Sequence, residues 1–375
     1  MIATTIKNGV PLILGDMLIS SSQLPAHFLL PTLFDNVIPY LPPSTDYPVD
    51  LRQKIYFLAP HVCAAFAGTV AHIKPFLEDV AMYCRYCPDI KGADLQAYVQ
   101  QYVAATPLGD VVMQILVLDK MEGIPLMHIM KAGHWETGTS PLVGDITAAG
   151  SGAVDFIAMA ELEANVLHAV EASQLHEQAI LANVTLIVRI LAQERAVLTT
   201  VQRYWGAGFE VAYAEGGDFH KLDDITFIIF QGQIDETGHI ETPAPVLILY
   251  YKYHGDNLVI TALMSPHGAI HVTETHYIFR YIEFYAYPFI VKPIIPMGDD
   301  RQPPTDTSFV STRLAAGYLI GANGGYYIPA SLHFEQDMKV EYRHQKSLII
   351  TMDKHIMETL IGQVKSEFSH EKKSL

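Results

Sequence analysis

Cysteine and histidine side chains, which can bind metals or carry redox chemistry, each cluster at one place in the sequence. Cys84 and Cys87 have the spacing of a redox pair or half a zinc site, but they end a predicted helix and no second cysteine pair follows. The densest histidine cluster comprises His267, His271, Glu274 and His276. On a strand, positions 267 and 271 share one face while 274 and 276 share the other. The sequence favours structural cysteines and incidental histidines, and predicts no metal and no cofactor.

The first twenty residues hold a different set of groups, arranged by a hairpin. Asn8-Gly9 is the strongest short-range signal for a two-residue type I′ turn. That turn places Thr4 opposite Ile13 and Met1 opposite Asp16. Thr4 and Thr5 then lie inside a strand, where their nitrogens are ordinary peptide nitrogens. The alternative, a three-residue turn at residues 9–11, would bring Thr4 opposite Asp16.

Three motifs carry a family resemblance over residues 1–235. They are the strand ending in Gly15-Asp16, the segment KIYFLAPHVCAAFAG at 54–68, and Gly150-Ser151-Gly152. In this order and spacing they resemble a proteasome-type N-terminal-nucleophile (Ntn) hydrolase. Its catalytic members attack a carbonyl with an N-terminal threonine whose own amine is the base. The resemblance implies that Asp16 and Lys54 are the aspartate and lysine beside that threonine, and that Ser151 is the serine near it.

Two further positions depart from the family's catalytic pattern. After their fourth helix, catalytic members carry an aspartate and a serine, where this chain has Gln202 and Trp205. Tryptophan cannot replace a small hydroxyl in volume or in hydrogen bonding. With Met1 opposite Asp16, three of six expected polar positions are unsuitable. Asp16, Lys54 and Ser151 are retained.

Each retained residue also has a structural interpretation. A serine at the start of a helix caps it without any catalysis. A buried carboxylate and ammonium persist as an ion pair, because losing one partner strands the other charge. For a chain without a nucleophile, we expect Asp16 and Lys54 to fix the register of two strands.

Composition narrows the class of protein. The 375 residues include 24 Lys and Arg against 40 Asp and Glu, a net charge of −16, which disfavours nucleic acid and anionic membrane surfaces as partners. Three cysteines are too few for a secreted disulfide framework, so a cytoplasmic location is expected. Residues 10–33 are apolar, but Asp16 interrupts them, and we predict no targeting or membrane-spanning segment.

The order of predicted elements suggests a fold. Strand pairs are expected at 54–59 and 62–67, at 110–119 and 125–132, and at 208–217 and 223–233. They alternate with helix pairs, the helices being expected at about 69–84, 93–105, 154–171 and 175–203. With the resemblance, this predicts an α+β, four-layer α-β-β-α Ntn-hydrolase (proteasome-like) sandwich at 1–235, interrupted by a Pro-rich insertion at 21–52. Residues 240–375 are predicted to form a C-terminal α+β extension, with strands at 246–253, 257–264 and 338–352 and a helix near 354–368.

The sequence thus predicts a proteasome-like pseudoenzyme, a structural or interaction subunit of a homo-oligomer. Possible protein-binding segments are residues 21–52 and the aromatic run 277–287, each of which could instead pack within its own chain. The alternative is a threonine-type peptidase or amidohydrolase, with Thr4 exposed by removal of Met1–Ala3. A start upstream of Met1 is a third possibility.

Overall fold

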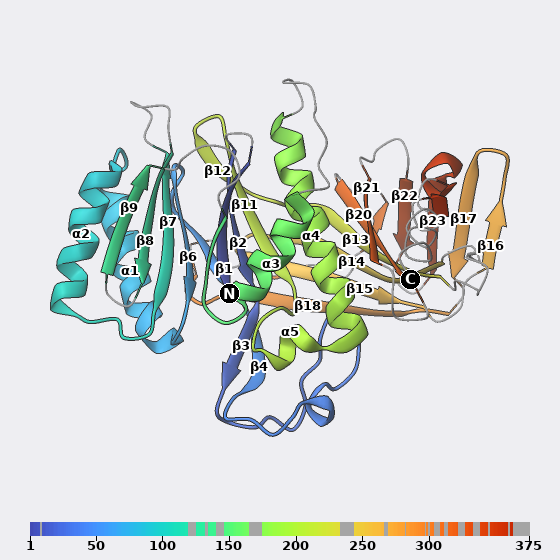
Figure 1. Cartoon of the computed structure of the whole chain (residues 1–375), viewed down its shortest axis with the longest axis horizontal. Helices are drawn as coiled ribbons and strands as arrows, with labels where there is room; N and C mark the ends of the chain where they lie inside the picture. The colour runs from blue at the N-terminus through green and yellow to red at the C-terminus, as the bar shows by residue number, and fades with distance from the viewer. Residues whose placement is uncertain are drawn as a thin grey trace, which may run out of the picture.

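The structure is a computed structural model with side chains (Figure 1). It describes these residues: 1–7, 10–118, 125–131, 134–139, 146–164, 175–232, 244–265, 269–281, 283–296, 298, 301–303, 308–310, 314–321, 327–332, 338–343, 346–358 and 361–362. Side chains are described within these ranges except at 7, 125–131, 134–139, 161–164, 175–178, 310, 314–316, 318–321 and 327–332. No helix among the described residues is long and apolar enough to cross a membrane.

The N-terminal hairpin lies at the centre of a five-stranded sheet in the order β10-β1-β2-β11-β12. Its strands are β1 (Ile2–Lys7), β2 (Val10–Asp16), β10 (Ile146–Ala149), β11 (Phe209–Glu215) and β12 (Asp218–Lys221). All of β2 is buried, because strands pair with both of its edges and apolar clusters cover both of its faces. Any polar group on β2 must therefore find a partner inside the protein.

A second five-stranded sheet, β5-β6-β7-β8-β9, packs against the first. Its strands are β5 (Ile55–Ala59), β6 (Val62–Ala67), β7 (Val112–Leu118), β8 (Pro125–Lys131) and β9 (His134–Thr139). Ile13 and Ile2 of the first sheet and Cys63 and Leu116 of the second share one apolar cluster. Helices α1 (Val70–Tyr86) and α2 (Gly92–Ala105) cover the opposite face, through Phe76, Leu77 and Val99 among others.

The largest sheet has eight strands in the order β21-β20-β13-β14-β15-β18-β4-β3. They are β3 (Leu18–Ser21), β4 (Tyr47–Gln53), β13 (Ile225–Gly232), β14 (Ala244–His254), β15 (Asn257–Met264), β18 (Tyr285–Pro293), β20 (Leu314–Gly321) and β21 (Tyr327–Leu332). Two pairings, β13 with β20 and β18 with β4, are parallel. The sheet thus joins strands from the beginning, middle and end of the chain.

The fourth sheet, β16-β17-β23-β22-β19, lies at the end of the molecule away from α1 and α2 (Figure 1). It consists of β16 (Ala269–Val272), β17 (His276–Tyr281), β19 (Phe309–Val310), β22 (Met338–Arg343) and β23 (Ser347–Asp353). Its inner face packs on the eight-stranded sheet, where Phe279 and Ile350 meet Ile228 and Phe230 of β13. Residues 354–358 continue β23 as helix.

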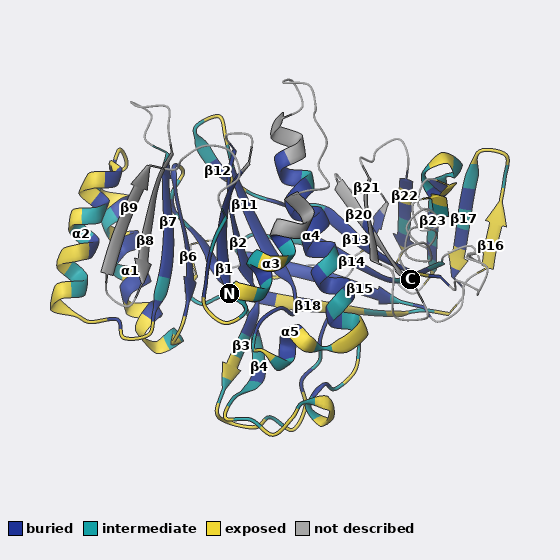
Figure 2. Cartoon of the chain, in the orientation of Figure 1, coloured by how far each residue is buried: buried dark blue, intermediate teal, exposed yellow. Residues whose placement is uncertain are grey.

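The remaining helices are α3 (Ala153–Ala164), α4 (Leu175–Val197), α5 (Thr199–Gln202) and a 3₁₀ helix at Ile38–Tyr40. Helix α4 is buried nearly all round from Ala179 to Glu194 (Figure 2). It touches β2 of the first sheet as well as β13, β20 and β21 of the largest. A helix that is apolar on every side must be covered on every side, and α4 satisfies this by lying between sheets.

The predicted four-layer α-β-β-α sandwich is wrong. The described residues contain more strand than helix and form four sheets, and α4 lies inside the molecule rather than in an outer layer. Strand β13, predicted to complete the first domain, pairs with β14 on one edge and β20 on the other. Alternate β13 side chains enter two different cores, with Phe227 and Ile229 in one and Ile228 and Phe230 in the other. A strand buried on both faces carries no signal for which sheet it joins.

Individual elements follow the sequence more closely than their assembly does. The pairs β5/β6, β7/β8, β14/β15 and β22/β23 and the helices α1 to α4 lie where patterning placed them, although α4 ends before 203. Strands β9, β10 and β12 were not predicted. The boundary proposed near 235–240 falls on residues outside the described ranges, so the two-domain division stays a prediction.

Candidate functional site

The hairpin register predicted from Asn8-Gly9 is confirmed, although those two residues lie outside the described ranges. Thr4 pairs with Ile13 and Ile2 with Gly15, and the backbone N–H of Asp16 donates to the Met1 carbonyl oxygen over 3.1 Å. A register shifted by a three-residue turn would have turned every side chain of β1 to the opposite face. Met1, not a threonine, therefore lies beside Asp16.

Asp16 is the centre of a buried ionic cluster at the end of β2. Its carboxylate pairs with the Met1 α-amine through Oδ2 and with Lys54 Nζ through Oδ1. Oδ1 also accepts the backbone N–H of Leu18 over 3.1 Å. All three charged groups are inaccessible or nearly so to solvent. The predicted contact between Asp16 and Lys54 is thus present, and the Met1 α-amine is a third member of the cluster.

One carboxylate can neutralise only one of the two cations in this cluster. Burial lowers the pKa of the Met1 α-amine from 8.0 to about 5, and the neighbouring Lys54 ammonium lowers it further while Asp16 opposes the shift. At neutral pH the amine is therefore uncharged. The neutral amine still donates a hydrogen bond to Asp16, whose other carboxylate oxygen pairs with Lys54.

A second buried carboxylate, Glu210 on β11, fixes Lys54 from the other side. Its Oε2 accepts the backbone N–H of Lys54 over 2.6 Å, and its Oε1 pairs with Lys221 Nζ at 2.5 Å. Lys221 also donates to the Ile55 carbonyl oxygen, and Tyr253 donates its hydroxyl to Glu210. The polar atoms of this network form hydrogen bonds within the protein, which is typical of a structural network rather than of a binding site.

The threonines are held away from Asp16. Thr4 Oγ1 donates to Gln114 Oε1 on β7 over 2.7 Å, and Gln114 Nε2 donates to the Thr147 carbonyl oxygen on β10. Thr5 donates to Asn183 of α4. Both threonines are buried in the strand, with peptide nitrogens on either side. Neither hydroxyl has a free amine or other base beside it.

The Ser151 hydroxyl bonds outside the cluster, although its neighbour Gly150 lies against Met1. Its hydroxyl donates to the Tyr204 carbonyl oxygen over 2.9 Å, joining the start of α3 to the segment after α5. The next residue, Gly152, has φ of +81°, and a β-carbon there would overlap the Trp205 indole ring. Trp205 is 1% exposed and packs on Phe209. The bulky indole thus fills the space beside Gly152.

The fit between Gly152 and Trp205 gives a direct test of this packing. Gly152→Ala is expected to lower the free energy of unfolding by about 2 kcal/mol, because the added methyl overpacks the core and the left-handed backbone disfavours any β-carbon. Urea unfolding measures the change. Gly216→Ala is the matched control, since Gly216 shares the positive φ but has open space around it. Equal losses in the two variants would mean that backbone conformation alone, and not Trp205, constrains Gly152.

A third buried carboxylate, Glu194 near the end of α4, has no cationic partner among the described residues. It accepts the Thr32 hydroxyl over 2.6 Å, the Thr200 hydroxyl over 3.0 Å and the Ala207 backbone N–H over 2.7 Å. Burial raises the pKa of Glu194, against the lowering effect of these donors. Sequence reasoning missed both Glu194 and Glu210. An isolated acidic residue within an apolar run, as in LIVRILAQE, was the available signal.

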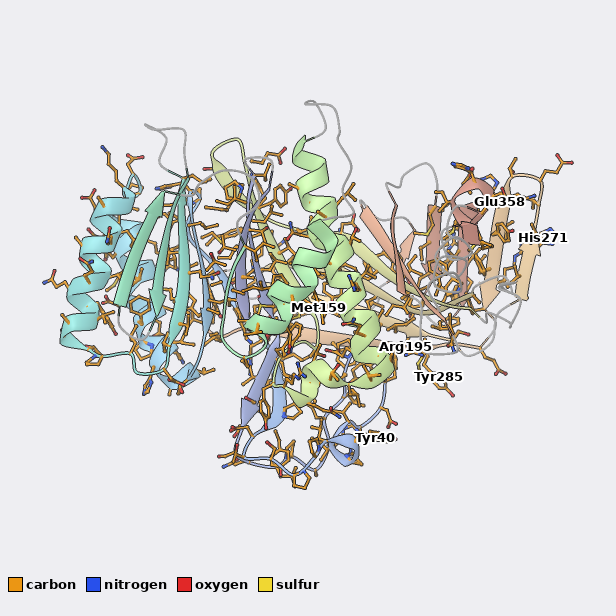
Figure 3. The ribbon with its side chains drawn as sticks, viewed as in Figure 1. Tyr40, Met159, Arg195, His271, Tyr285 and Glu358 are labelled. Atoms are coloured by element: carbon orange, nitrogen blue, oxygen red, sulfur yellow. The ribbon has the colours of Figure 1, made fainter. Side chains whose placement is uncertain are left out.

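The other candidate ligands do not converge. Cys63, Cys84 and Cys87 are free thiols, and burial raises the pKa of Cys84 to about 12, which makes it a poor nucleophile. His271 lies opposite Ile278, at the outer edge of the molecule on β16 (Figure 3), while His276 lies opposite Asp353. His267 falls outside the described ranges. Among the described residues, no group of three or more side chains could hold a metal.

The two predicted partner segments differ in how far they are buried. In the aromatic run, Tyr277, Phe279 and Tyr281 are core residues of the fourth sheet, whereas Tyr285 is 64% exposed and Tyr287 45% exposed. Within 21–52, Phe28, Leu30 and Val37 pack into the main core, and Leu24 and Tyr40 face solvent. Both interpretations, packing and exposure, therefore apply to different residues of the same segment.

Comparison with known proteins gives no assignment. No protein-family model matches this sequence, and no curated protein matches it.

Proposed function

We propose that this chain is a non-catalytic structural or interaction subunit of a homo-oligomeric assembly, related to proteasome-type subunits but lacking their nucleophile. The relationship rests on Asp16, Lys54 and the motifs of the first 152 residues, and not on the overall fold. The observation that carries the loss of catalysis is the Met1 α-amine on Asp16, in the place where a nucleophile should approach.

The surroundings of the cluster support the same proposal. Its atoms are shielded from water, and the Trp205 ring lies against Gly152. A catalytic centre needs a reactive atom within hydrogen-bonding reach of a base and an opening for substrate. Among the described side chains, no hydroxyl or thiol is paired with the Met1 amine, Asp16 or Lys54.

The proposal includes a cytoplasmic location and other copies of this chain as partners. The thiols of all three cysteines are free, which suits a reducing compartment and supports a cytoplasmic location. The net charge of −16 argues against nucleic acid and anionic membranes as partners. Assembly of like copies is the usual state of soluble oligomers. The exposed Tyr285, Tyr287 and Tyr40 are the side chains that we propose for such contacts.

The alternative, a threonine hydrolase that exposes Thr4, makes an opposite prediction for the intact mass. We expect a chain that begins at Met1 and that gains no mass on treatment with an electrophile that acylates N-terminal threonine. Removal of residues 1–3 together with an adduct on Thr4 would establish the hydrolase. The control is Thr4→Val, which cannot form that adduct and which leaves the ionic cluster unaltered.

Oligomeric state tests the other half of the proposal. Light scattering on the same unlabelled protein at micromolar concentration is expected to give a multiple of the 41.6 kDa chain. A monomer at every concentration up to about 100 µM would remove the assembly role, since that concentration corresponds to a dissociation constant too weak for a stable complex.

A further inference from the structure

Residues 22–46 form the loop that connects β3 to β4, which we name the flap. It leaves the eight-stranded sheet at β3 and returns at β4, on the side of the molecule below α5 (Figure 1). The β3/β4 ladder has a register shift between Ile19 and Ser20, at the base of the flap. A bulge of this kind bends and loosens a strand pair. The flap is therefore joined to the body by a ribbon that can act as a hinge.

Polar contacts attach the flap to one short stretch of chain, residues 194–204. Thr32 Oγ1 donates to Glu194, and Arg195 Nη1 donates to the Thr32 carbonyl oxygen over 2.9 Å. Ser44 and the Tyr204 hydroxyl share a further hydrogen bond. In Figure 3, Arg195 lies at the lower end of α4, and Tyr40 of the flap lies below it. All three attachments thus converge on the C-terminal end of α4 and the turns that follow it.

Apolar contacts complete the closed arrangement. Phe28, Leu30 and Val37 are buried in the main core, and the Phe34 ring stands edge-on to Phe289 of β18 with centroids 6.4 Å apart. These contacts favour closure. They also mean that release of the flap would bare an apolar surface on both the flap and the body.

Backbone strain is concentrated at the same contacts. Five described residues other than glycine have positive φ. Three of them, Phe34, Leu198 and Tyr204, are in the flap or in residues 194–204, and Ala207 lies just beyond. Left-handed backbone is disfavoured for such residues and persists only where the surrounding structure imposes it. Strain of this kind is typical of segments that change state.

Glu194 adds a second term that opposes closure. Glu194 is fully buried. Two hydroxyls and a backbone N–H, rather than a cation, donate hydrogen bonds to its carboxyl group. The ionisable groups that act on it are Asp16 of β2 and Tyr251 of β14. Arg195, its neighbour on α4, binds the Thr32 carbonyl instead. Opening the flap would let water reach this carboxylate.

We propose that the flap is a two-state element, closed through Thr32 on Glu194 as described above, and able to open about the β3/β4 bulge without unfolding the sheets. Opening removes three polar contacts and the edge contact of Phe34, relaxes the left-handed residues and hydrates Glu194. Closing buries the apolar side chains of the flap. The opposing terms involve only the flap and residues 194–207, so the opening is local.

Hydrogen exchange of the full-length protein at pH 7 tests this directly. The informative amides are those of Phe34 and Val37, which bond within the flap to Leu30 and Phe28 carbonyl oxygens. In the wild type they are expected to exchange at least about tenfold faster than amides of β13 to β15, as for a sub-global opening. Thr32→Val, which removes the hydroxyl hydrogen bond to Glu194, is expected to accelerate flap exchange about tenfold further.

The same experiment carries its own controls. Thr45→Val changes an exposed flap threonine that does not reach Glu194, and is expected to leave exchange unaltered. Amides of β13 to β15 are expected to keep their rates in Thr32→Val. If Phe34 and Val37 exchange at the rate of β13 to β15 in the wild type, or if Thr32→Val accelerates all of them equally, the flap opens only with global unfolding and the proposal fails.

Discussion

Asp16→Asn is expected to lower the free energy of unfolding by about 3–5 kcal/mol, because it leaves the Lys54 ammonium buried without its counter-charge. The asparagine side chain is nearly isosteric and can still accept the Leu18 N–H. The loss therefore reports charge and not packing. Urea unfolding at pH 7, followed by circular dichroism and by tryptophan fluorescence, measures it through the midpoint at constant slope.

Asp50→Asn is the matched control for this prediction. Asp50 pairs with Arg52 at 2.7 Å in the same part of the chain, but the two side chains are 47% and 37% exposed. Exposed ion pairs contribute from about 0 to 1 kcal/mol, so the control is expected to change little. If Asp16→Asn costs no more than Asp50→Asn, the buried cluster does not hold the hairpin in place, and its structural role is refuted.

The buried α-amine predicts that the protein becomes more stable as pH rises from about 5 to 8. In the folded state the pKa of this amine is about 5, and in the unfolded chain it returns to its ordinary value of 8.0. Between these values the unfolded chain binds more protons, so the free energy of unfolding increases with pH. A pKa difference of about three corresponds to about 4 kcal/mol across the window. Below pH 5 and above pH 8 this contribution is constant.

Two measurements separate the amine from other groups that titrate in the same range. Desolvation also lowers the pKa of His254, which acts in the same direction, so the pH series is repeated in His254→Asn. An intact mass must show an unmodified Met1 in the samples used. A stability that is flat or falling between pH 5.5 and 7.5 in His254→Asn would show that the amine is not buried uncharged.

The cluster of Met1, Asp16 and Lys54 has the composition of a catalytic site but the environment of a structural ion pair. A lysine, an aspartate and an amine of lowered pKa are groups that hydrolases use. Here each of them is bonded to another member of the cluster, and the nearest threonine, Thr4, points to Gln114. A perturbed pKa therefore identifies burial, and only the neighbouring atoms decide whether the group can act on a substrate.

Local sequence was sufficient to predict how the first hairpin pairs. The Asn-Gly turn, together with strict period-two geometry, fixes which residues face each other, and the pairing of Thr4 with Ile13 follows from those alone. Helices α1 to α4 and the pairs β5/β6, β7/β8, β14/β15 and β22/β23 were equally predictable, because periodicity and turn residues are properties of neighbouring positions. The predicted pairing of 208–217 with 223–233 was wrong, since β11 and β13 lie in different sheets. The meeting of Asp16 with Lys54 came from a resemblance, and not from spacing.

The arrangement of the sheets was decided only by tertiary structure. The segment ITFIIFQG is apolar on both faces from Phe227 to Phe230, so its pattern is compatible with either edge and either face. Its choice of β14 and β20 as neighbours depends on partner residues as far as 89 positions away (Ile225 with Leu314), and with that choice α4 becomes an interior helix. Glu194 and Glu210 acquire their roles in the same way, since their partners lie on other elements.

What the sequence determined by itself is thus the pairing of Met1 with Asp16, and with it the absence of a threonine at that position. What only the tertiary structure decided is that this pairing is sealed from solvent by Lys54, Glu210 and the packed sheets, and that the flap closes on Glu194. The physical reason is the distance along the sequence over which each of these effects acts. Turn and strand geometry act between neighbouring residues, whereas burial, which sets the charge of the amine and the cost of each carboxylate, is a property of the whole fold.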